Sequence, residues 1–349
     1  MSGRHAHSVV VARAPGKIFL TGEYAVLVGA PALVAAVDRV AEIRIAPQCA
    51  PESLAITSLA EGERRVVDGE DRRELPGGDA GAVLAAHRAV SARVRLPEGL
   101  DVTVDSRAFL VGARKLGLGR SAATLAGTVA GLLAVAGQRR ESAEPLEVAL
   151  LALAHFQGGE GSGADLAAAV RGGVVEVVRH DTRLAVASRG LPTGLELLVG
   201  WTGEGAATVP LLRRFSAAIR TEPATLRELR VTAESAAAAV TAGDRLAFLQ
   251  AVDRSGSLLE QLGREIGLPI TTPALARLVA AARRAGAAAK PSGAGGGDCG
   301  IAFATSPAQA AAVRAAWEAE GIVPLPLAIE PAGVRTWTDA RATEGVSLA

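Results

Sequence analysis

Three lysines occur among the 349 residues of this chain, and each of them lies in or beside a glycine-rich stretch. They are Lys17, Lys115 and Lys290, in the segments 14–17, 115–123 and 290–298. Glycine lets backbone N–H groups approach a ligand closely, and lysine places a compact positive charge at the end of a flexible stem. Backbone N–H groups and such charges together bind phosphate groups. We therefore predict that these separated segments fold together around a single anion-binding cavity.

The composition disfavours several other classes of protein. A length of 349 residues suits one large domain or two ordinary ones, and a hydrophobic fraction of 49% is enough for a substantial core. The net charge is +1 and no basic run resembles a nucleic-acid-binding arm. The longest weakly polar run, residues 122–137, is too short and too rich in alanine and glycine to span a membrane, and residues 1–8 lack the apolar core of a secretory signal. These features predict a cytoplasmic protein that binds neither nucleic acid nor membranes.

Patterns of apolar residues predict a mixed chain of helices and strands. Strands are expected at residues 9–12, 40–46, 100–105, 173–179, 195–201, 299–304 and 321–329. Helices are expected at residues 82–94, 121–136, 146–156, 164–170, 273–285 and 308–320. The character of the sequence changes near residues 182–194, beyond which long helices follow. We therefore place one domain over residues 1–185 and a second over residues 186–349.

The segment 117–123 carries the most phosphate chemistry. Its glycines lead directly into an alanine-rich helix, so unpaired N–H groups and the positive end of the helix dipole would face an anion. The Ser121 hydroxyl is placed to bind a phosphate oxygen or a magnesium ion. A glycine turn before a core helix is the alternative interpretation, but the flanking Lys115 and Ser121 favour phosphate binding.

The best general-base candidate is Asp165, which follows glycines that would admit a substrate. Taken alone, Asp165 is better explained as an ordinary first-turn residue stabilised by the helix dipole. A nearby Lys17 would shift the balance, because a lysine could keep the carboxylate ionised and polarise a substrate hydroxyl. Tyr24 has two open interpretations, as a residue that lines the pocket or as a simple core residue.

The three segments, in this order, resemble the motifs of the GHMP kinases, which act on galactose, homoserine, mevalonate and phosphomevalonate. The resemblance rests on residues 15–24, 117–123 and 290–300 and spans almost the whole chain. It implies an α+β, two-domain GHMP kinase fold. In that fold an N-terminal ribosomal-protein-S5-like domain carries the nucleotide loop, and a C-terminal ferredoxin-like α/β sandwich domain closes over the acceptor.

Within the family, the motifs are most similar to those of the members that act on phosphomevalonate. Tyr24 stands where mevalonate kinases usually have histidine, and related kinases usually lack an aspartate at the Asp298 position. The resemblance implies ATP-dependent phosphorylation of (R)-5-phosphomevalonate to 5-diphosphomevalonate in isoprenoid biosynthesis, with ATP and Mg²⁺ as cofactors. The acceptor would be this small molecule, and the protein a monomer or homodimer.

The resemblance also implies roles for individual residues. Lys17 and Asp165 would be catalytic, and Ser121 would bind the metal. The implied ATP-binding residues are Lys115, Gly117, Leu118, Gly119, Arg120, Ser121 and Ala122. The implied substrate-binding residues are Lys17, Tyr24, Ser162, Gly163, Lys290, Ser292, Gly293, Ala294 and Asp298.

Two departures from the family pattern keep alternatives open. Arg120 stands where the family usually has serine, and it could add a bidentate phosphate contact or crowd the nucleotide. No second magnesium carboxylate is evident, although Glu160 is nearby in sequence. The alternatives are another GHMP enzyme, such as a mevalonate kinase or a diphosphomevalonate decarboxylase-like enzyme, and a nucleotide-binding protein that has lost turnover.

Overall fold

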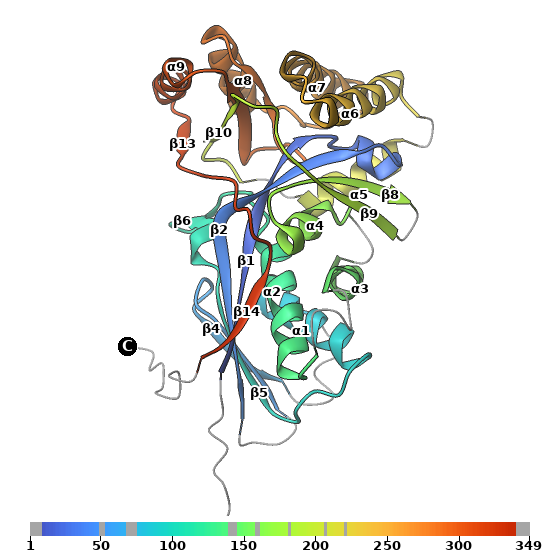
Figure 1. Cartoon of the computed structure of the whole chain (residues 1–349), viewed down its shortest axis with the longest axis vertical. Coiled ribbons are helices and arrows are strands. Elements are labelled where there is room, and N and C mark those ends of the chain that lie inside the picture. Colours follow the sequence, from blue (N-terminus) through green and yellow to red (C-terminus); the bar gives the residue numbers. More distant parts are fainter. Residues whose placement is uncertain are drawn as a thin grey trace, which may run out of the picture.

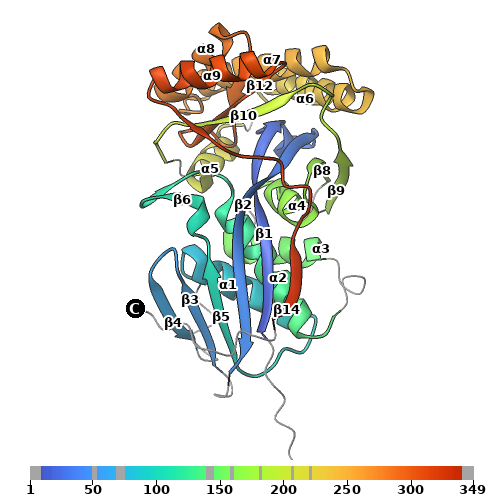
Figure 2. The same cartoon turned by 60° about the vertical axis from the view of Figure 1, so that its left-hand side comes forward.

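The computed structural model describes residues 9–48, 53–67, 75–138, 145–157, 161–180, 183–205, 208–219 and 222–339. Over these residues the chain forms an eight-stranded sheet at one end of the molecule and a four-stranded sheet at the other. Helices cover both sheets, and Figures 1 and 2 show the two parts stacked along the long axis. The expected α+β class is confirmed.

The larger sheet has the strand order β14-β1-β2-β5-β3-β4, and β8 and β9 extend it from β2. Its strands are β1 (Val9–Thr21), β2 (Ala32–Pro47), β3 (Leu54–Ser58), β4 (Glu63–Val67), β5 (Leu100–Asp105), β8 (Val174–His180), β9 (Arg183–Arg189) and β14 (Arg335–Asp339). The helices α1 (Gly78–Ser91), α2 (Arg120–Val135), α3 (Pro145–Gln157) and α4 (Ala164–Arg171) gather on one side of it (Figure 1).

Small residues let α2 approach this sheet closely. A Cβ atom on Gly127 would lie 2.3 Å from the Ile43 side chain, and one on Gly131 would lie 2.8 Å from that of Ile45. The alanine- and glycine-rich sequence of α2 is therefore a packing requirement of the core as well as part of the predicted phosphate-binding motif.

The smaller sheet has the order β11-β12-β10-β13. Its strands are β10 (Glu196–Trp201), β11 (Ala288–Pro291), β12 (Cys299–Ala304) and β13 (Val323–Leu325). The helices of this part are α5 (Thr208–Ala218), α6 (Ala224–Ala242), α7 (Arg245–Glu265), α8 (Pro273–Arg284) and α9 (Pro307–Ala319). Short elements beside the larger sheet are the 3₁₀ turns η1 (Ala25–Val28) and η3 (Arg107–Phe109) and the hairpin of β6 (Leu110–Val111) and β7 (Arg114–Lys115).

Three of the differences between the described elements and the sequence expectations bear on the division into domains. β9 runs through residues 183–189, where the chain was expected to change domain. The strand expected at 321–329 is shortened to β13, which ends just before Pro326, a residue with no N–H to donate to a ladder. β14 returns to pair with β1, so residues 335–339 belong to the first sheet. The division at residues 185 and 186 stays a prediction.

No helix among the described residues combines the length and the hydropathy that crossing a membrane would require.

Candidate functional site

The three glycine-rich segments meet at one cavity of about 400 Å³ between the two sheets. The first segment lies in β1, the second precedes α2, and the third connects β11 to β12. Residues from all three segments and from the start of α4 line the cavity, among them Lys17, Lys115, Gly119, Ser121, Asp165, Ser292 and Asp298. The predicted convergence of these segments is therefore present in the structure.

Glycines hold the first and second segments in direct contact. The backbone N–H of Lys17 donates to the carbonyl of Leu118 at 2.8 Å. Gly119 has a φ of +81°, and a Cβ atom there would lie 2.8 Å from Cγ of Lys17. The Lys17 stem thus passes directly over the residue that caps α2, and only glycine accepts both the backbone conformation and the contact.

The second and third segments are also in contact, through Asp298. A Cβ atom on Gly117 would lie 2.4 Å from Cβ of Asp298, so the aspartate packs against the Gly117 backbone. Asp298 has a φ of +58°. Its carbonyl accepts hydrogen bonds from the N–H and hydroxyl of Thr202, and its own N–H donates to Glu204. These three bonds hold an unusual backbone conformation at the edge of the cavity.

A buried ion pair joins the first and third segments. The ammonium of Lys290 donates to Oε1 of Glu23, and the N–H of Gly293 donates to the same oxygen at 3.2 Å. Burial lowers the pKa of Lys290, and the charge and hydrogen bond of Glu23 oppose that shift. The Lys290 side chain is 0% exposed and is not among the residues that line the cavity. This corrects its expected role in substrate binding: Lys290 neutralises a buried carboxylate.

Tyr24 fits both of its sequence interpretations. It is buried, its ring centroid lies 4.6 Å from that of Phe215, and it also lines the cavity. Its hydroxyl donates to the carbonyl of Ala294, which ties η1 to the third segment. Nearby, the hydroxyl of Ser292 donates to the carbonyl of Phe19 at 2.8 Å. Burial and, to a smaller extent, the charge of Glu23 raise the pKa of Tyr24 far above its usual value, so the phenol remains a donor.

The expected catalytic pair is formed at the start of α4. Nζ of Lys17 lies 3.3 Å from Oδ2 of Asp165, with the lysine side chain 10% exposed and the aspartate side chain 39% exposed. Gly163 caps α4 with a φ of +75°, and the hydroxyl of Ser162 accepts a hydrogen bond from Ala164 at 3.2 Å. Both side chains line the cavity, and the Asp165 carboxylate is the more exposed of the two.

The first turn of α2 is available to an anion. No side chain caps its N-terminus, because the capping residue is Gly119. The N–H groups of Ser121 and Ala122 belong to this first turn, and both residues line the cavity. Lys115, on the exposed hairpin of β6 and β7, also lines it. An uncapped helix start beside a lysine can bind phosphate through N–H groups and charge.

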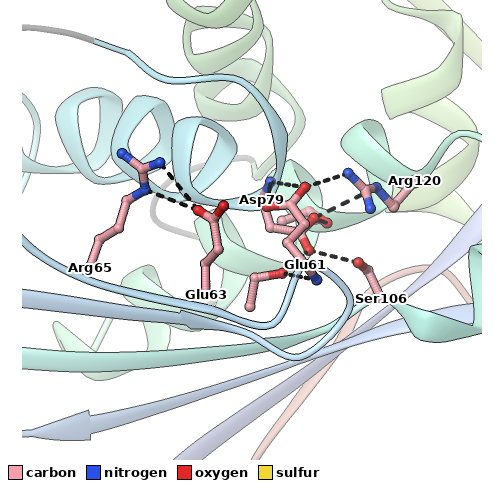
Figure 3. Close-up of polar contacts among 8 residues, drawn as sticks. Glu61, Glu63, Arg65, Asp79, Ser106 and Arg120 are labelled. Carbon is pink, nitrogen blue, oxygen red and sulfur yellow. Dashed lines mark hydrogen bonds and ion pairs between the residues drawn. The ribbon is translucent and has the colours of Figure 1, made fainter. Parts of the chain in front are cut away.

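The side chain of Arg120 has partners in other elements. Its Nη2 lies 2.6 Å from Oε1 of Glu61, and its Nε lies 3.9 Å from Oδ1 of Asp79 (Figure 3). Sequence analysis missed both carboxylates. Asp79 follows Gly77 and Gly78 at the start of α1, a helix-start signal that could have drawn attention to it. Glu160, the other carboxylate considered for metal binding, lies outside the described residues.

Comparison with known proteins places this arrangement in a family. The sequence family of the GHMP kinases N terminal domain matches residues 81–173, and the family of the GHMP kinases C terminal region matches residues 236–323. A phosphomevalonate kinase from a Streptomyces species is 35% identical over 362 aligned residues, which cover 91% of this chain and 96% of that protein.

Solved structures show the same fold. A protein from Listeria innocua matches with a TM-score of 0.82 at 22% identity, over 95% of this chain and 99% of that one. Streptococcus pneumoniae phosphomevalonate kinase in complex with phosphomevalonate and AMPPNP matches with a TM-score of 0.77 at 24% identity, over 91% of this chain and 99% of that one. With both domain matches and a 35% identical relative, this chain belongs to the GHMP kinases.

Proposed function

We propose that this protein transfers the γ-phosphoryl group of ATP to the phosphate of (R)-5-phosphomevalonate, which yields 5-diphosphomevalonate and ADP. The observation that supports this best is the convergence of Lys17, Asp165 and the uncapped start of α2 at one cavity. The 35% identical relative is a phosphomevalonate kinase, and the match covers nearly the full length of both proteins.

The nucleotide phosphates would lie at the second segment. N–H groups of residues 117–122 and the positive end of the α2 dipole suit the β- and γ-phosphates. Lys115 would add a positive charge from the hairpin above them. Among the implied ATP-binding residues, Leu118 contributes through its backbone, since its carbonyl accepts from Lys17 and its side chain is buried.

The acceptor would lie between α4 and the third segment. Ser162, Gly163, Ser292, Gly293 and Ala294 line this side of the cavity, together with Tyr24 and Asp298. Lys290 is removed from this set because of its burial. The ion pair of Lys290 and the hydroxyl of Tyr24 hold the third segment beside β1 and η1.

The chemistry needs little proton transfer, because the acceptor phosphate is already ionised at neutral pH. An oxygen of that phosphate forms a bond to the γ-phosphorus, while the bond from the γ-phosphorus to the β,γ-bridging oxygen breaks and ADP leaves. Positioning and charge neutralisation therefore outweigh base catalysis. In this proposal Lys17 neutralises charge on the transferred group, and Asp165 orients the Lys17 ammonium.

Mg²⁺ is the metal that the oxygen donors at the cavity suit. Among the described residues, no cluster of three or more His, Cys, Asp or Glu side chains could hold a metal ion. Mg²⁺ is usually held by one or two carboxylates together with substrate phosphates and water, so it needs no such cluster. Ser121, together with the nucleotide phosphates and water, would hold it, and the bound ion would neutralise phosphoryl charge.

The test is a coupled ADP-release assay with phosphomevalonate, mevalonate and homoserine as acceptors. We expect kcat/KM for phosphomevalonate to exceed the other values by at least about 100-fold, because a site built for a second phosphate leaves buried polar groups unpaired without it. A higher value for mevalonate would overturn the assignment, as would ATP-dependent release of carbon dioxide from diphosphomevalonate. Nucleotide binding without transfer to any acceptor would indicate a protein that has lost turnover.

Two further expectations accompany this proposal. A cytoplasmic location would give the enzyme access to the ATP pool, and fractionation of cells would test it. A monomer or homodimer remains the expected oligomeric state, which light scattering on the purified protein would determine.

A further inference from the structure

We infer that Arg120 is a positioning residue for the nucleotide, acting through a cluster that it forms with Glu61 and Asp79. This set of three residues is called the Arg120 cluster below. The inference rests on the proposed nucleotide site but not on the identity of the acceptor. It assigns Arg120 a role different from the two considered for it above, a phosphate contact and a steric obstacle.

Asp79 is a buried carboxylate that three hydroxyl groups already surround. Its side chain is 1% exposed. Oδ2 accepts hydrogen bonds from Ser58 at 2.8 Å and from Ser106 at 2.7 Å, and Oδ1 accepts one from Thr124 at 3.2 Å. A buried carboxylate is costly unless a positive charge accompanies such bonds. Nε of Arg120, 3.9 Å from Oδ1, supplies that charge.

Glu61, in the turn between β3 and β4, covers the start of α1. Both of its carboxylate oxygens accept from the N–H of Asp79, at 3.3 and 3.2 Å. A Cβ atom on Gly78 would lie 2.2 Å from Oε1, so the carboxylate rests directly on that glycine. The positive end of the α1 dipole stabilises this position. The contacts with Asp79 and Gly78 thus hold the Glu61 carboxylate in place independently of its hydrogen bond from Arg120.

The cluster links the nucleotide loop to two other elements. Arg120 is the first residue of α2 and directly follows the cap Gly119. Its side chain is 14% exposed and is held by carboxylates from α1 and from the β3–β4 turn (Figure 3). Because the guanidinium is hydrogen-bonded to Glu61 and paired with Asp79, holding it in place restrains the first turn of α2. The N–H groups proposed to bind phosphate are in this turn.

The Arg120 guanidinium also determines the net charge at the side of the cavity where the nucleotide phosphates would lie. Arg120 lines the cavity, and Glu61 and Asp79 lie immediately behind it. ATP is a polyanion, so two unneutralised carboxylates at that position would repel it. Arg120 therefore places a cation between the phosphates and these carboxylates. Replacing it by serine, the usual residue of the family, would remove this cation while Glu61 and Asp79 remain.

The experiment measures binding of AMPPNP to the purified protein by calorimetry, together with the KM values for ATP and for the acceptor. We expect Arg120→Ser to weaken AMPPNP binding about tenfold, a typical coupling within one ionic network, and to leave the acceptor KM within about twofold. Adding Glu61→Gln to Arg120→Ser removes the exposed negative charge. The double variant should then bind AMPPNP within about threefold of the wild-type protein.

The neighbouring pair of Arg65 and Glu63 supplies the control. Their side chains form an ion pair at 3.1 Å on β4, but both are about half exposed and neither lines the cavity. Arg65→Ser should change neither AMPPNP binding nor either KM. Arg120→Lys keeps a positive charge without the planar fork, and we expect it to recover part of the affinity that Arg120→Ser loses.

Several outcomes would overturn the inference. Arg120→Ser that binds AMPPNP as tightly as the wild-type protein, or more tightly, would show that Arg120 crowds the nucleotide or has no role. A double variant as weak as the product of the two single effects would show that the residues act independently. If Arg120→Ser does not fold, Glu61→Gln alone must weaken binding more than Glu63→Gln does. AMPPNP binding needs no acceptor, so this test is independent of the assignment of phosphomevalonate.

Discussion

In the proposed reaction, Asp165 would act through its charge, by orienting Lys17, rather than as a base. Its Oδ2 is 3.3 Å from the Lys17 ammonium, at a cavity that would hold phosphates from two substrates. A base is of little use to an acceptor that is already ionised, whereas an oriented ammonium is useful throughout the transfer. We therefore describe Lys17 as the cation that stabilises the transferred group and Asp165 as the residue that positions it, rather than the two as an acid and a base.

This description predicts the behaviour of an Asp165→Asn variant. The amide cannot hold the ammonium as a carboxylate does, so we expect kcat to fall on the order of 100-fold while the KM for the acceptor changes little. Steady-state kinetics with both substrates would measure this. Asp105→Asn, which alters a surface pair with Arg107, serves as the control and should keep kcat. A drop confined to substrate affinity in Asp165→Asn would contradict the proposed role.

A second prediction at this scale concerns Tyr24, the one tyrosine of the sequence. Burial and the charge of Glu23 raise its pKa in the folded protein, while the unfolded chain should titrate near the usual value of about 10. The folded state therefore holds a proton that the unfolded state loses above about pH 10, so unfolding becomes easier as the pH rises there.

Phenolate absorbance reports this residue alone. We expect the native protein to show none until well above pH 10, and the urea-unfolded protein to titrate at about pH 10. Tyr24→Phe should remove the signal and flatten the corresponding decline in the free energy of unfolding. Native phenolate absorbance that appears at the ordinary pKa would show that the hydroxyl is not enclosed.

At the scale of single elements, α2 carries a matched pair of glycines at its two ends. Gly119 caps the start with a φ of +81°, and Gly137 follows the end with a φ of +70°. A Cβ atom at Gly119 would press on the Lys17 stem, whereas one at Gly137 would have nothing within 4 Å. Replacing either glycine by alanine strains the backbone, but only the replacement at Gly119 also displaces Lys17. Comparison of the two variants therefore separates the two effects.

We expect Gly119→Ala and Gly137→Ala each to lower the free energy of unfolding by about 1 kcal/mol, through the left-handed conformation. Only Gly119→Ala should also lower kcat, by roughly tenfold or more, because Lys17 must shift. Denaturant unfolding and steady-state kinetics on the two variants test this. Equal kinetic effects in both would show that Lys17 is not positioned by this contact.

The sequence predicted individual helices and strands better than it predicted the contacts between them. The glycines and Ser121 predicted the start of α2 because a helix terminus is specified locally. The direction of the Arg120 side chain was not readable, because its partner Glu61 is 59 residues away. Lys290 was assigned to the substrate because its local surroundings are glycines, while Glu23, 267 residues earlier, determines its actual role. β14 was missed because its pairing with the distant strand β1, rather than a local pattern, defines it. β9 pairs with its neighbour β8, and it was missed because the change in sequence character near residues 182–194 was interpreted as a domain boundary.

At the scale of the whole molecule, the ion pair of Lys290 and Glu23 joins the two sheets. Both side chains are almost fully buried, so removing one partner leaves an uncompensated charge. We expect Lys290→Met to lower the free energy of unfolding by about 3–5 kcal/mol, and Lys290→Met combined with Glu23→Leu to lower it by much less.

Urea unfolding of the single and double variants would measure this difference. Arg264→Met breaks an exposed pair with Glu260 on α7 and is the control, with an expected loss of no more than about 0.5 kcal/mol. A Lys290→Met variant as stable as that control would mean that Glu23 finds another partner when the lysine is removed.

The pairing of β14 with β1 also has a consequence for how the protein is made. Val9 pairs with Asp339, so the outer edge of β1 is filled by residues that are synthesised long after it. A nascent chain emerging from the ribosome can form the β1–β2 hairpin, but its open edge persists until residues 335–339 have emerged. Unpaired strand edges invite association with other chains. Slow translation or an early stop before residue 335 should therefore favour aggregation of the nascent polypeptide.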